Sequence, residues 1–116
     1  MLKKEILRRK DDFSLIYKKG KSTGERYIVL FYKKNCLSYN RTAFLASKKV
    51  GNSVARNRAR RLMKENYRFL RDDIKKGFDL IFIARNSING KKAQDVNKSM
   101  INALSKAKLL ERQPIK

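Results

Sequence analysis

The sequence predicts an α+β fold: a single-domain α/β sandwich in which a small central sheet packs against helices. Three observations support this prediction. A chain of 116 residues is long enough for one modest core. Three short runs, at 26–33, 42–47 and 78–84, are rich in β-branched, aromatic and other apolar residues, as strands are. Apolar residues at helical spacing precede, separate and follow these runs. The predicted order is α-β-β-α-β-α, with room for one more short strand near Lys21.

A short first helix is predicted after a basic leader at residues 1–9, which we expect to be flexible. Asp11 and Asp12 place negative charge in its first turn, and Gly20 marks its end. Its apolar side chains have the i, i+3, i+4 spacing of one helix face: Phe13, Ile16 and Tyr17. All three side chains belong to the core, or the ring edges of Phe13 and Tyr17 line a cleft. The spacing is compatible with both interpretations.

Two strands are expected next, after a turn at 21–25. The run 26–33 carries apolar side chains on both faces, so this strand is covered on both sides or presents an aromatic binding face. The run 42–47 is expected to pair with it as an antiparallel hairpin, joined by a loop that contains Cys36. We interpret this lone cysteine as chemically inert.

A long helix is predicted over residues 53–75, with a core-facing stripe and a separate cationic face. The stripe consists of Ala55, Ala59, Leu62, Asn66 and Leu70, flanked by Met63 and Phe69. The cationic face consists of Arg56, Arg60, Lys64, Arg68 and Arg71. The most hydrophobic run, 78–84, is predicted to be a central buried strand. If 42–47 and 78–84 are parallel neighbours, the long helix is the crossover between them.

The last helix is predicted over residues 91–109, after a turn at 86–90. Its apolar stripe consists of Val96, Met100, Ala103, Leu104 and Ala107. The tail at 111–116, which contains Pro114, is expected to be flexible.

The stretch from Ser47 to Lys64 carries the main functional signal, because it holds seven cations and no carboxylate. Gly51 and Asn52 predict a turn that leads into a helix near Ser53, capped by Asn52 or Ser53. The first amides of a helix and its dipole favour an anion, and the planar arginine fork suits phosphate oxygens. A solvated basic face is the simpler alternative, but ordinary surface helices intersperse acids with bases. A phosphate-binding helix start is the favoured interpretation.

The net charge of +21 makes an anionic partner the first expectation, and nucleic acid is favoured over a membrane. No run approaches the roughly 20 apolar residues of a membrane-spanning helix. Residues 1–10 lack the apolar stretch of a secretory signal. A single cysteine excludes an internal disulfide, which fits a reducing cytoplasm. With no histidine and one cysteine, the chain is not expected to bind zinc.

Residues 48–64, KKVGNSVARNRARRLMK, resemble the signature of the bacterial ribonuclease P protein subunit. The RNR at 56–58 matches the motif of that family, with KK at 48–49 and GN at 51–52 in the expected places. Three further segments also look like the family: DDFSLIYKKGK at 11–21, RYIVLF at 26–31 and DLIFIAR at 79–85. The resemblance covers residues 3–108, and the combined pattern is highly specific.

The resemblance implies a protein subunit of a ribonucleoprotein that matures the 5′ end of tRNA, with catalysis on a large RNA and no catalytic residue in the protein. The expected partners are ribonuclease P RNA and precursor tRNA, with a monomeric protein and with Mg²⁺ bound through the RNA. The family fold also implies a left-handed crossover, contrary to the general rule. The predicted RNA-binding residues are Lys48, Lys49, Asn52, Arg56, Asn57, Arg58, Arg60, Arg61 and Lys64. The resemblance implies a cleft for the 5′ leader at Phe13, Tyr17 and Phe31.

Two other function classes are compatible with parts of the sequence. A general RNA-binding structural protein, such as a ribosomal protein, fits the charge and size equally well. A nuclease in its own right fits less well, because the ten acids are scattered and no histidine is present for acid–base work. Within the motif, the amide of Asn57 either bonds RNA or braces neighbouring side chains, and the sequence favours neither role.

Overall fold

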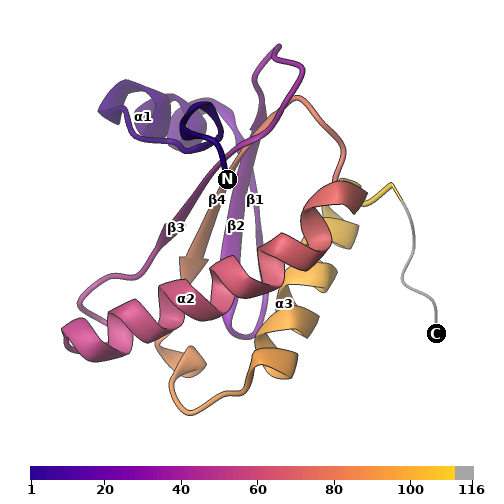
Figure 1. The fold of residues 1–116 in the computed structure, drawn as a ribbon. Helices are drawn as coiled ribbons and strands as arrows, with labels where there is room; N and C mark the ends of the chain where they lie inside the picture. Colours follow the sequence, from indigo (N-terminus) through magenta and orange to yellow (C-terminus); the bar gives the residue numbers. More distant parts are fainter. Residues whose placement is uncertain (112–116) are drawn as a thin grey trace.

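The computed structural model describes residues 1–111 and is built around a four-stranded mixed sheet in the order β1-β2-β4-β3 (Figure 1). The strands are β1 (Lys21–Gly24), β2 (Ile28–Lys34), β3 (Arg41–Leu45) and β4 (Phe78–Ala84). β1 and β2 pair antiparallel, as do β2 and β4, whereas β3 and β4 are parallel. The optional strand near Lys21 is therefore present, in place of the turn predicted at 21–25. The tail beyond residue 111, predicted to be flexible, lies outside the described residues.

The predicted hairpin between the second and third strands is wrong, because β4 lies between β2 and β3. Two asparagines of the connecting loop bind the chain near the start of β4 instead. Asn35 donates a hydrogen bond from Nδ2 to Asp79 (2.9 Å), and Asn40 accepts one from the Phe78 amide (2.8 Å). β4 is buried along most of its length, as its hydrophobic run predicts, and takes a central position. The alternative pairing, β3 parallel to β4, is confirmed.

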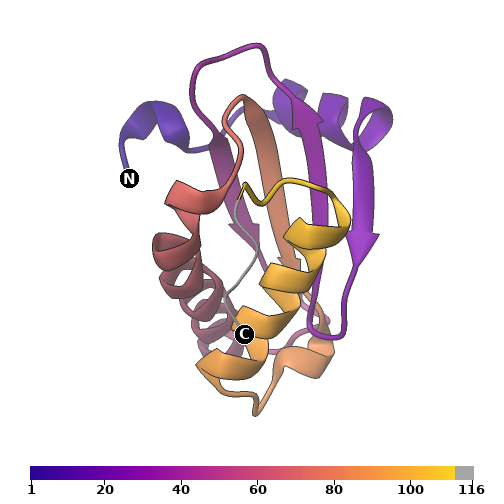
Figure 2. The ribbon, with the colours of Figure 1, turned by 90° about the vertical axis from the view of Figure 1, so that its right-hand side faces the viewer.

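Two long helices, α2 (Ser53–Leu70) and α3 (Ala93–Lys106), cover one face of the sheet (Figure 2). α2 links β3 to β4, as predicted for the crossover; its left-handedness stays a prediction. The helix stops short of residue 75, and the 3₁₀ turn η2 (Arg71–Asp73) follows it. Another 3₁₀ turn, η3 (Asn86–Ile88), lies in the loop before α3. The helix α3 itself is shorter than the helix predicted over 91–109.

The core-facing stripe of α2 differs from the prediction at its C-terminal end. Phe69 is 80% exposed and does not flank the core. Tyr67 takes that role: it is 5% exposed, and its ring meets Phe44 and Phe82 at centroid distances of 5.5 and 5.9 Å. The Tyr67 hydroxyl accepts a hydrogen bond from Thr42 Oγ1 (2.9 Å), which explains how a polar group is accommodated in the core. On α3, Val96, Met100, Ala103 and Leu104 are buried as predicted.

The opposite face of the sheet is only partly covered, by α1 (Lys10–Lys19) and the N-terminal segment. A small second core forms there from Leu7, Ile16, Ala43 and Ile81. Residues 1–9 include the 3₁₀ turn η1 (Lys3–Glu5), and the Leu7 amide donates to the carbonyl of Thr42 (3.0 Å). The N-terminal segment therefore packs along β3 in the structure; its flexibility in solution stays a prediction.

Gly20 ends α1 as predicted, but a close backbone approach, not a left-handed conformation, explains the glycine. A Cβ at this position would lie 2.5 Å from the Ile16 carbonyl oxygen and 2.7 Å from that of Tyr32. Because both atoms belong to the backbone, no side chain fits without a shift of the helix or the sheet.

In the loop between β2 and β3, Cys36 is exposed, and its chemical inertness stays a prediction.

Candidate nucleic-acid interface

The turn before α2 places the first predicted RNA-binding residues on the surface. Lys48 and Lys49 are exposed, and Gly51 adopts a φ of +147°, a conformation that L side chains rarely adopt. Asn52 is the N-cap of α2, and its Oδ1 accepts a hydrogen bond from the Ala55 amide (3.0 Å). The predicted helix start at Ser53 and the cap at Asn52 are therefore confirmed.

The cations of α2 lie on two sides of the helix. With about 100° between successive residues, positions 56, 60, 61, 64 and 68 share one broad side, and position 58 lies away from them. We define the basic helix face as Arg56, Arg60, Arg61, Lys64 and Arg68. Arg58 lies toward α3 instead, where its Nη2 donates to the carbonyl of Lys91 (2.5 Å). Of the two arginines of the RNR motif, Arg56 therefore belongs to the basic helix face, whereas Arg58 contacts the loop before α3.

Hydrogen bonds between neighbouring side chains position part of the basic helix face. Arg60 Nη2 donates to Asn57 Oδ1, and Arg56 Nη2 donates to Ser53 Oγ (3.3 Å). The Nε of Arg56 is buried without a hydrogen-bond partner within residues 1–111. Of the two roles considered for Asn57, bracing is thus observed, and a direct RNA contact stays a prediction.

The three predicted cleft residues come together on the open face of the sheet. Tyr17 and Phe31 meet edge to face with ring centroids 5.0 Å apart, and Phe13 lies 6.5 Å from Tyr17. Tyr17 is 43% exposed, whereas its neighbour Ile16 is fully buried. Partial burial raises the pKa of the Tyr17 hydroxyl. The helix therefore combines both interpretations: Ile16 belongs to the core, and the rings of Phe13 and Tyr17 line a hollow.

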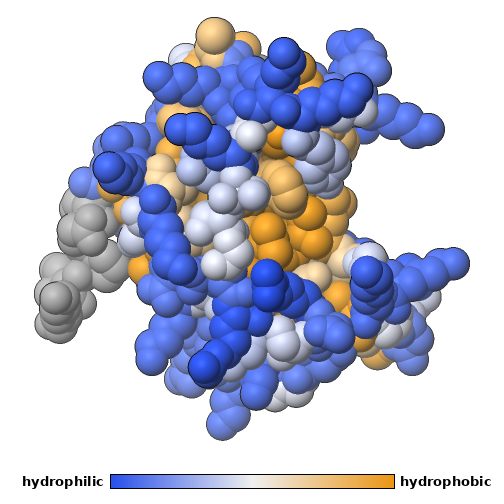
Figure 3. Space-filling model, turned by 180° about the vertical axis from the view of Figure 1, so that it is seen from behind, coloured by the Kyte–Doolittle hydropathy of each residue, from blue (hydrophilic) through white to orange (hydrophobic). Residues whose placement is uncertain are grey.

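Two adjoining cavities run from these rings to the basic helix face. A cavity of about 410 Å³ lies between β3 and α2, where Leu45 and Phe13 face Lys64 and Arg68. A second cavity of about 400 Å³ is lined by Lys10, Phe13, Ser14, Tyr17 and Leu45. Because Phe13 and Leu45 line both, the cavities form one path, which we name the apolar cleft together with Phe31. Figure 3, which views the molecule from the side opposite α2, shows an apolar area bordered above and below by hydrophilic side chains.

Several residues at this interface were not predicted from the sequence. Leu45 joins the two cavities, and Leu7 of the leader lines the larger one. The alternation of Arg41, Ala43 and Leu45 along a strand was the available signal for Leu45, because these residues share one face. For Leu7 the signal was weaker: one apolar residue in a basic segment.

No group suited to hold a metal ion appears in the part of the chain that the structure describes. Within residues 1–111, no three His, Cys, Asp or Glu side chains are close enough to share a cation. Asp79, the most buried acid, is paired with Arg41 at 2.7 Å.

None of the helices within residues 1–111 is long and apolar enough to cross a membrane.

The chain matches known proteins over nearly its whole length. The family model described as Ribonuclease P matches residues 1–108. A ribonuclease P protein component of Clostridium botulinum (strain Loch Maree / Type A3) is 47% identical over 107 residues, covering 91% of this chain and 96% of the relative. The corresponding protein of Clostridium acetobutylicum is 40% identical over 111 residues, covering 94% and 93%.

Solved structures agree with the sequence relatives. A Staphylococcus aureus RNase P protein mutant with defective mRNA degradation activity superposes with a TM-score of 0.86 at 31% identity, covering 93% of this chain and 92% of that one. The RNase P protein from Thermotoga maritima gives a TM-score of 0.78 at 31% identity, covering 96% and 99%. The chain therefore belongs to the ribonuclease P protein family, the protein component of the endoribonuclease that matures the 5′ end of tRNA.

Proposed function

We propose that this protein binds the catalytic RNA of ribonuclease P through the turn at 48–52 and the basic helix face. In the same complex, its apolar cleft binds the single-stranded 5′ leader of precursor tRNA. The chemistry takes place on the RNA, and the protein acts in the cytoplasm as a monomer within the ribonucleoprotein. Arg58 contributes by joining α2 to the loop before α3, and its remaining donors face the RNA.

The observation that carries this proposal is the continuity of the two surfaces. Phe13 and Leu45 line both cavities, so the aromatic rings of α1 lead directly to Lys64 and Arg68 of α2. Phe31 of β2 adjoins this path through its edge-to-face contact with Tyr17. An RNA strand in this path has a stacking surface for its bases and cations for its phosphates. Such a combination is typical of proteins that bind single strands of varied sequence.

The two surfaces suit different parts of the RNA. Unpaired bases stack on aromatic side chains with little regard to sequence, at about 1–3 kcal/mol per base. Leaders that differ in sequence fit the apolar cleft for this reason. Structured RNA is recognised mainly by its shape and phosphates, which suits the cations of the basic helix face.

Mg²⁺ is assigned to the RNA subunit in this proposal. Within residues 1–111, no three acids lie close enough to hold a divalent ion together, which supports this assignment. The contribution of the protein is to neutralise phosphates, and the complex therefore needs less Mg²⁺ than the RNA alone.

The function is tested by multiple-turnover cleavage of precursor tRNA at low Mg²⁺. Protein alone, a bacterial ribonuclease P RNA alone, and the mixture are compared. Activity only in the mixture supports the proposal. Activity of the protein alone would show that the protein itself is a nuclease, and no enhancement in the mixture would favour a general RNA-binding protein.

The division between the surfaces is tested with matched variants. Tyr17→Leu and Phe31→Leu keep apolar volume but remove the stacking rings, so they should weaken binding of leader-bearing precursor tRNA while sparing assembly with the RNA subunit. Arg60→Ala should weaken assembly by about tenfold. Phe69→Leu is the control for loss of an aromatic ring, since Phe69 is exposed on α2 outside the apolar cleft. Identical defects in both groups would contradict the two-surface model.

A further inference from the structure

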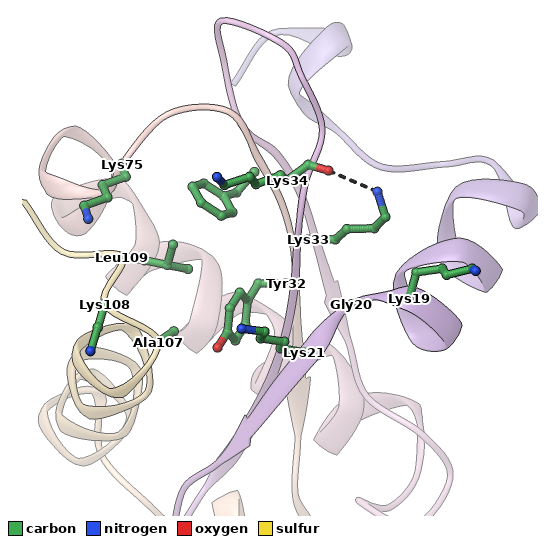
Figure 4. A pocket seen from close by; sticks show the side chains of 11 residues that line it. Lys19, Gly20, Lys21, Tyr32, Lys33, Lys34, Lys75, Ala107, Lys108 and Leu109 are labelled. Carbon is green, nitrogen blue, oxygen red and sulfur yellow. Dashed lines mark hydrogen bonds between the residues drawn. The ribbon is translucent and has the colours of Figure 1, made fainter.

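A third cationic region lies at the other edge of the sheet. A pocket of about 360 Å³ forms where the end of α1, β1, the end of β2, the start of β4 and the residues that follow α3 meet (Figure 4). It shares no lining residue with either cavity of the apolar cleft. We name it the lysine pocket, because six lysines line it: Lys19, Lys21, Lys33, Lys34, Lys75 and Lys108.

The lysine pocket contains no acid to balance this charge. None of its lining residues is Asp or Glu. The ion pairs within residues 1–111 use Arg41, Arg71 and Lys106 as their cations, and none of the six lysines takes part. Helix C-termini attract cations, which accounts for Lys19 and Lys108. The other four lie on strands or before β4, where no helix dipole explains them, and their mutual repulsion favours an external polyanion.

Two aromatic side chains line the pocket together with the lysines. Tyr32 and Phe78 line the pocket, and both are partly buried against the main core. Figure 4 shows Lys21 beside Tyr32, with Lys34, Lys75 and Lys108 on one side of it, whereas Lys19 and Lys33 point away from the ring. Rings that are fixed by the core and open on one side offer a flat apolar surface to a base.

Hydrogen bonds of the backbone hold the frame of the pocket. The Lys75 amide donates to the Leu109 carbonyl (2.7 Å), and Ile74 and Leu110 form an antiparallel bridge. This link brings Lys75 beside the end of α3. Lys108 has a φ of +60°, a left-handed conformation that glycine would adopt with less strain. The backbones that carry the cations are therefore positioned before any ligand binds.

We propose that the lysine pocket is a third RNA-binding site, which holds the phosphates on either side of one unpaired nucleotide while its base stacks on Tyr32. Lysine ammonium groups are point charges that contact phosphates without reading sequence, and the aromatic ring accepts any base. This inference rests on the proposed function, since it assumes that the partner is the RNA of the ribonucleoprotein. The site lies at the β1 edge, whereas the apolar cleft lies at the β3 edge. The protein therefore contacts RNA at both edges of its sheet.

The test compares two double variants that remove the same charge. The pocket variant, Lys34→Gln/Lys108→Gln, removes two of the lysines that line the pocket. The control variant, Lys18→Gln/Lys98→Gln, removes two exposed lysines that line none of the surfaces described above. The affinity for a bacterial ribonuclease P RNA is measured against salt concentration. We expect the pocket variant to bind about tenfold more weakly at moderate salt and its log–log salt slope to become shallower by about 2, with little change in the control. Lys34→Arg/Lys108→Arg should restore both quantities, which separates loss of charge from loss of fold.

Contact is tested directly by attaching an iron chelate that generates hydroxyl radicals to Lys108→Cys in a Cys36→Ser background. Discrete cuts in the RNA, at nucleotides different from those cut from Arg61→Cys, support the proposal. Pocket variants equal to the control, or no cuts from position 108, overturn it. If the pocket variants lose binding to polyglutamate but not to RNA, an acidic protein is the ligand and the proposal is again wrong. Failure of the wild-type protein to bind the RNA would instead refute the proposed function itself.

Discussion

Arg41 donates two hydrogen bonds to Asp79, from Nε to Oδ1 at 2.8 Å and from Nη2 to Oδ2 at 2.7 Å. The hydrogen bonds to Asp79 raise the pKa of Arg41, against the opposing effect of partial burial. The third nitrogen, Nη1, lies 3.3 Å from Asp12 Oδ2. One side chain of β3 thus connects β4 to the first turn of α1, and it holds the helix that carries Phe13 and Tyr17 over the open face.

Arg41→Met is expected to lower the free energy of unfolding by on the order of 3 kcal/mol, because the buried carboxylate of Asp79 loses its charged partner. Asp12→Asn should cost less than about 1 kcal/mol, since its contact is longer and more exposed. Urea unfolding of both variants checks the difference. Equal losses would show that Asp79 is satisfied by Asn35 alone.

Binding to the RNA subunit should depend steeply on salt. If six to eight cations contact phosphates, the log–log slope of affinity against salt should be about −4 to −7. Filter binding or fluorescence anisotropy over a range of KCl concentrations measures it. A slope near zero would contradict an interface that relies on the basic helix face.

Asn57→Ala and Arg60→Ala should have non-additive effects on RNA affinity, because the Asn57 amide braces the Arg60 guanidinium. Once Arg60 is absent, loss of Asn57 should cost little, giving a coupling energy of at least about 0.5 kcal/mol in a double-mutant cycle. Effects that add fully would show that Asn57 contacts the RNA on its own.

Tyr67→Phe should change how stability depends on pH. Burial raises the pKa of Tyr67 above its ordinary value of 10.0, although the hydrogen bond from Thr42 opposes this. The folded state therefore favours the neutral phenol, and this contribution is present below pH 10.0 and is lost as the pH rises through the folded pKa.

At neutral pH the variant should be less stable by about 1 kcal/mol, because the buried Thr42 hydroxyl loses its partner. Above pH 10.0 its stability should fall less steeply than that of the wild type. Urea unfolding at neutral pH and above pH 10.0 tests both expectations. Parallel pH curves would exclude a contribution of the Tyr67 hydroxyl to the pH dependence of stability.

Gly20→Ala should destabilise the protein by about 1–3 kcal/mol, because the new methyl group meets two backbone carbonyls that cannot move independently. Ser22→Ala on exposed β1 serves as a control for changes near the same edge. Thermal unfolding distinguishes the two. A neutral Gly20→Ala would mean that the end of α1 readily shifts away from β2.

The elements that depend on local pattern were predictable from the sequence. The run 78–84 is hydrophobic throughout, and it forms β4 with the predicted bounds; the cap at Asn52 and the start of α2 follow from residues that act on their immediate neighbours. The strand order was not predictable, because it rests on pairing between segments that are distant in the sequence. Asn35 and Asn40 illustrate this, since their side chains bind residues about 40 positions away. Nothing in local spacing distinguishes such asparagines from ordinary loop residues.

The apolar cleft and the lysine pocket also combine features that follow from local pattern with features that depend on contacts between distant segments. Helical spacing placed Phe13 and Tyr17 on one face, and their partner Phe31 was known only through the resemblance. Leu45 and the lysine pocket arise where distant segments meet, and neither has a local motif. Phe69 was misassigned because it lies at the edge of a regular stripe, where a small rotation decides whether a ring is buried or exposed.

β3 is an edge strand, and of its residues only Thr42 is paired on the outer side within residues 1–111, through the bridge to Ile6. An open edge of this kind readily accepts a strand from another copy of the chain and starts aggregation. Lys64 and Arg68 stand along the cavity beside that edge, so two copies that approach edge to edge bring like charges together. The cations that we propose to bind RNA therefore also disfavour edge-to-edge pairing of two free copies.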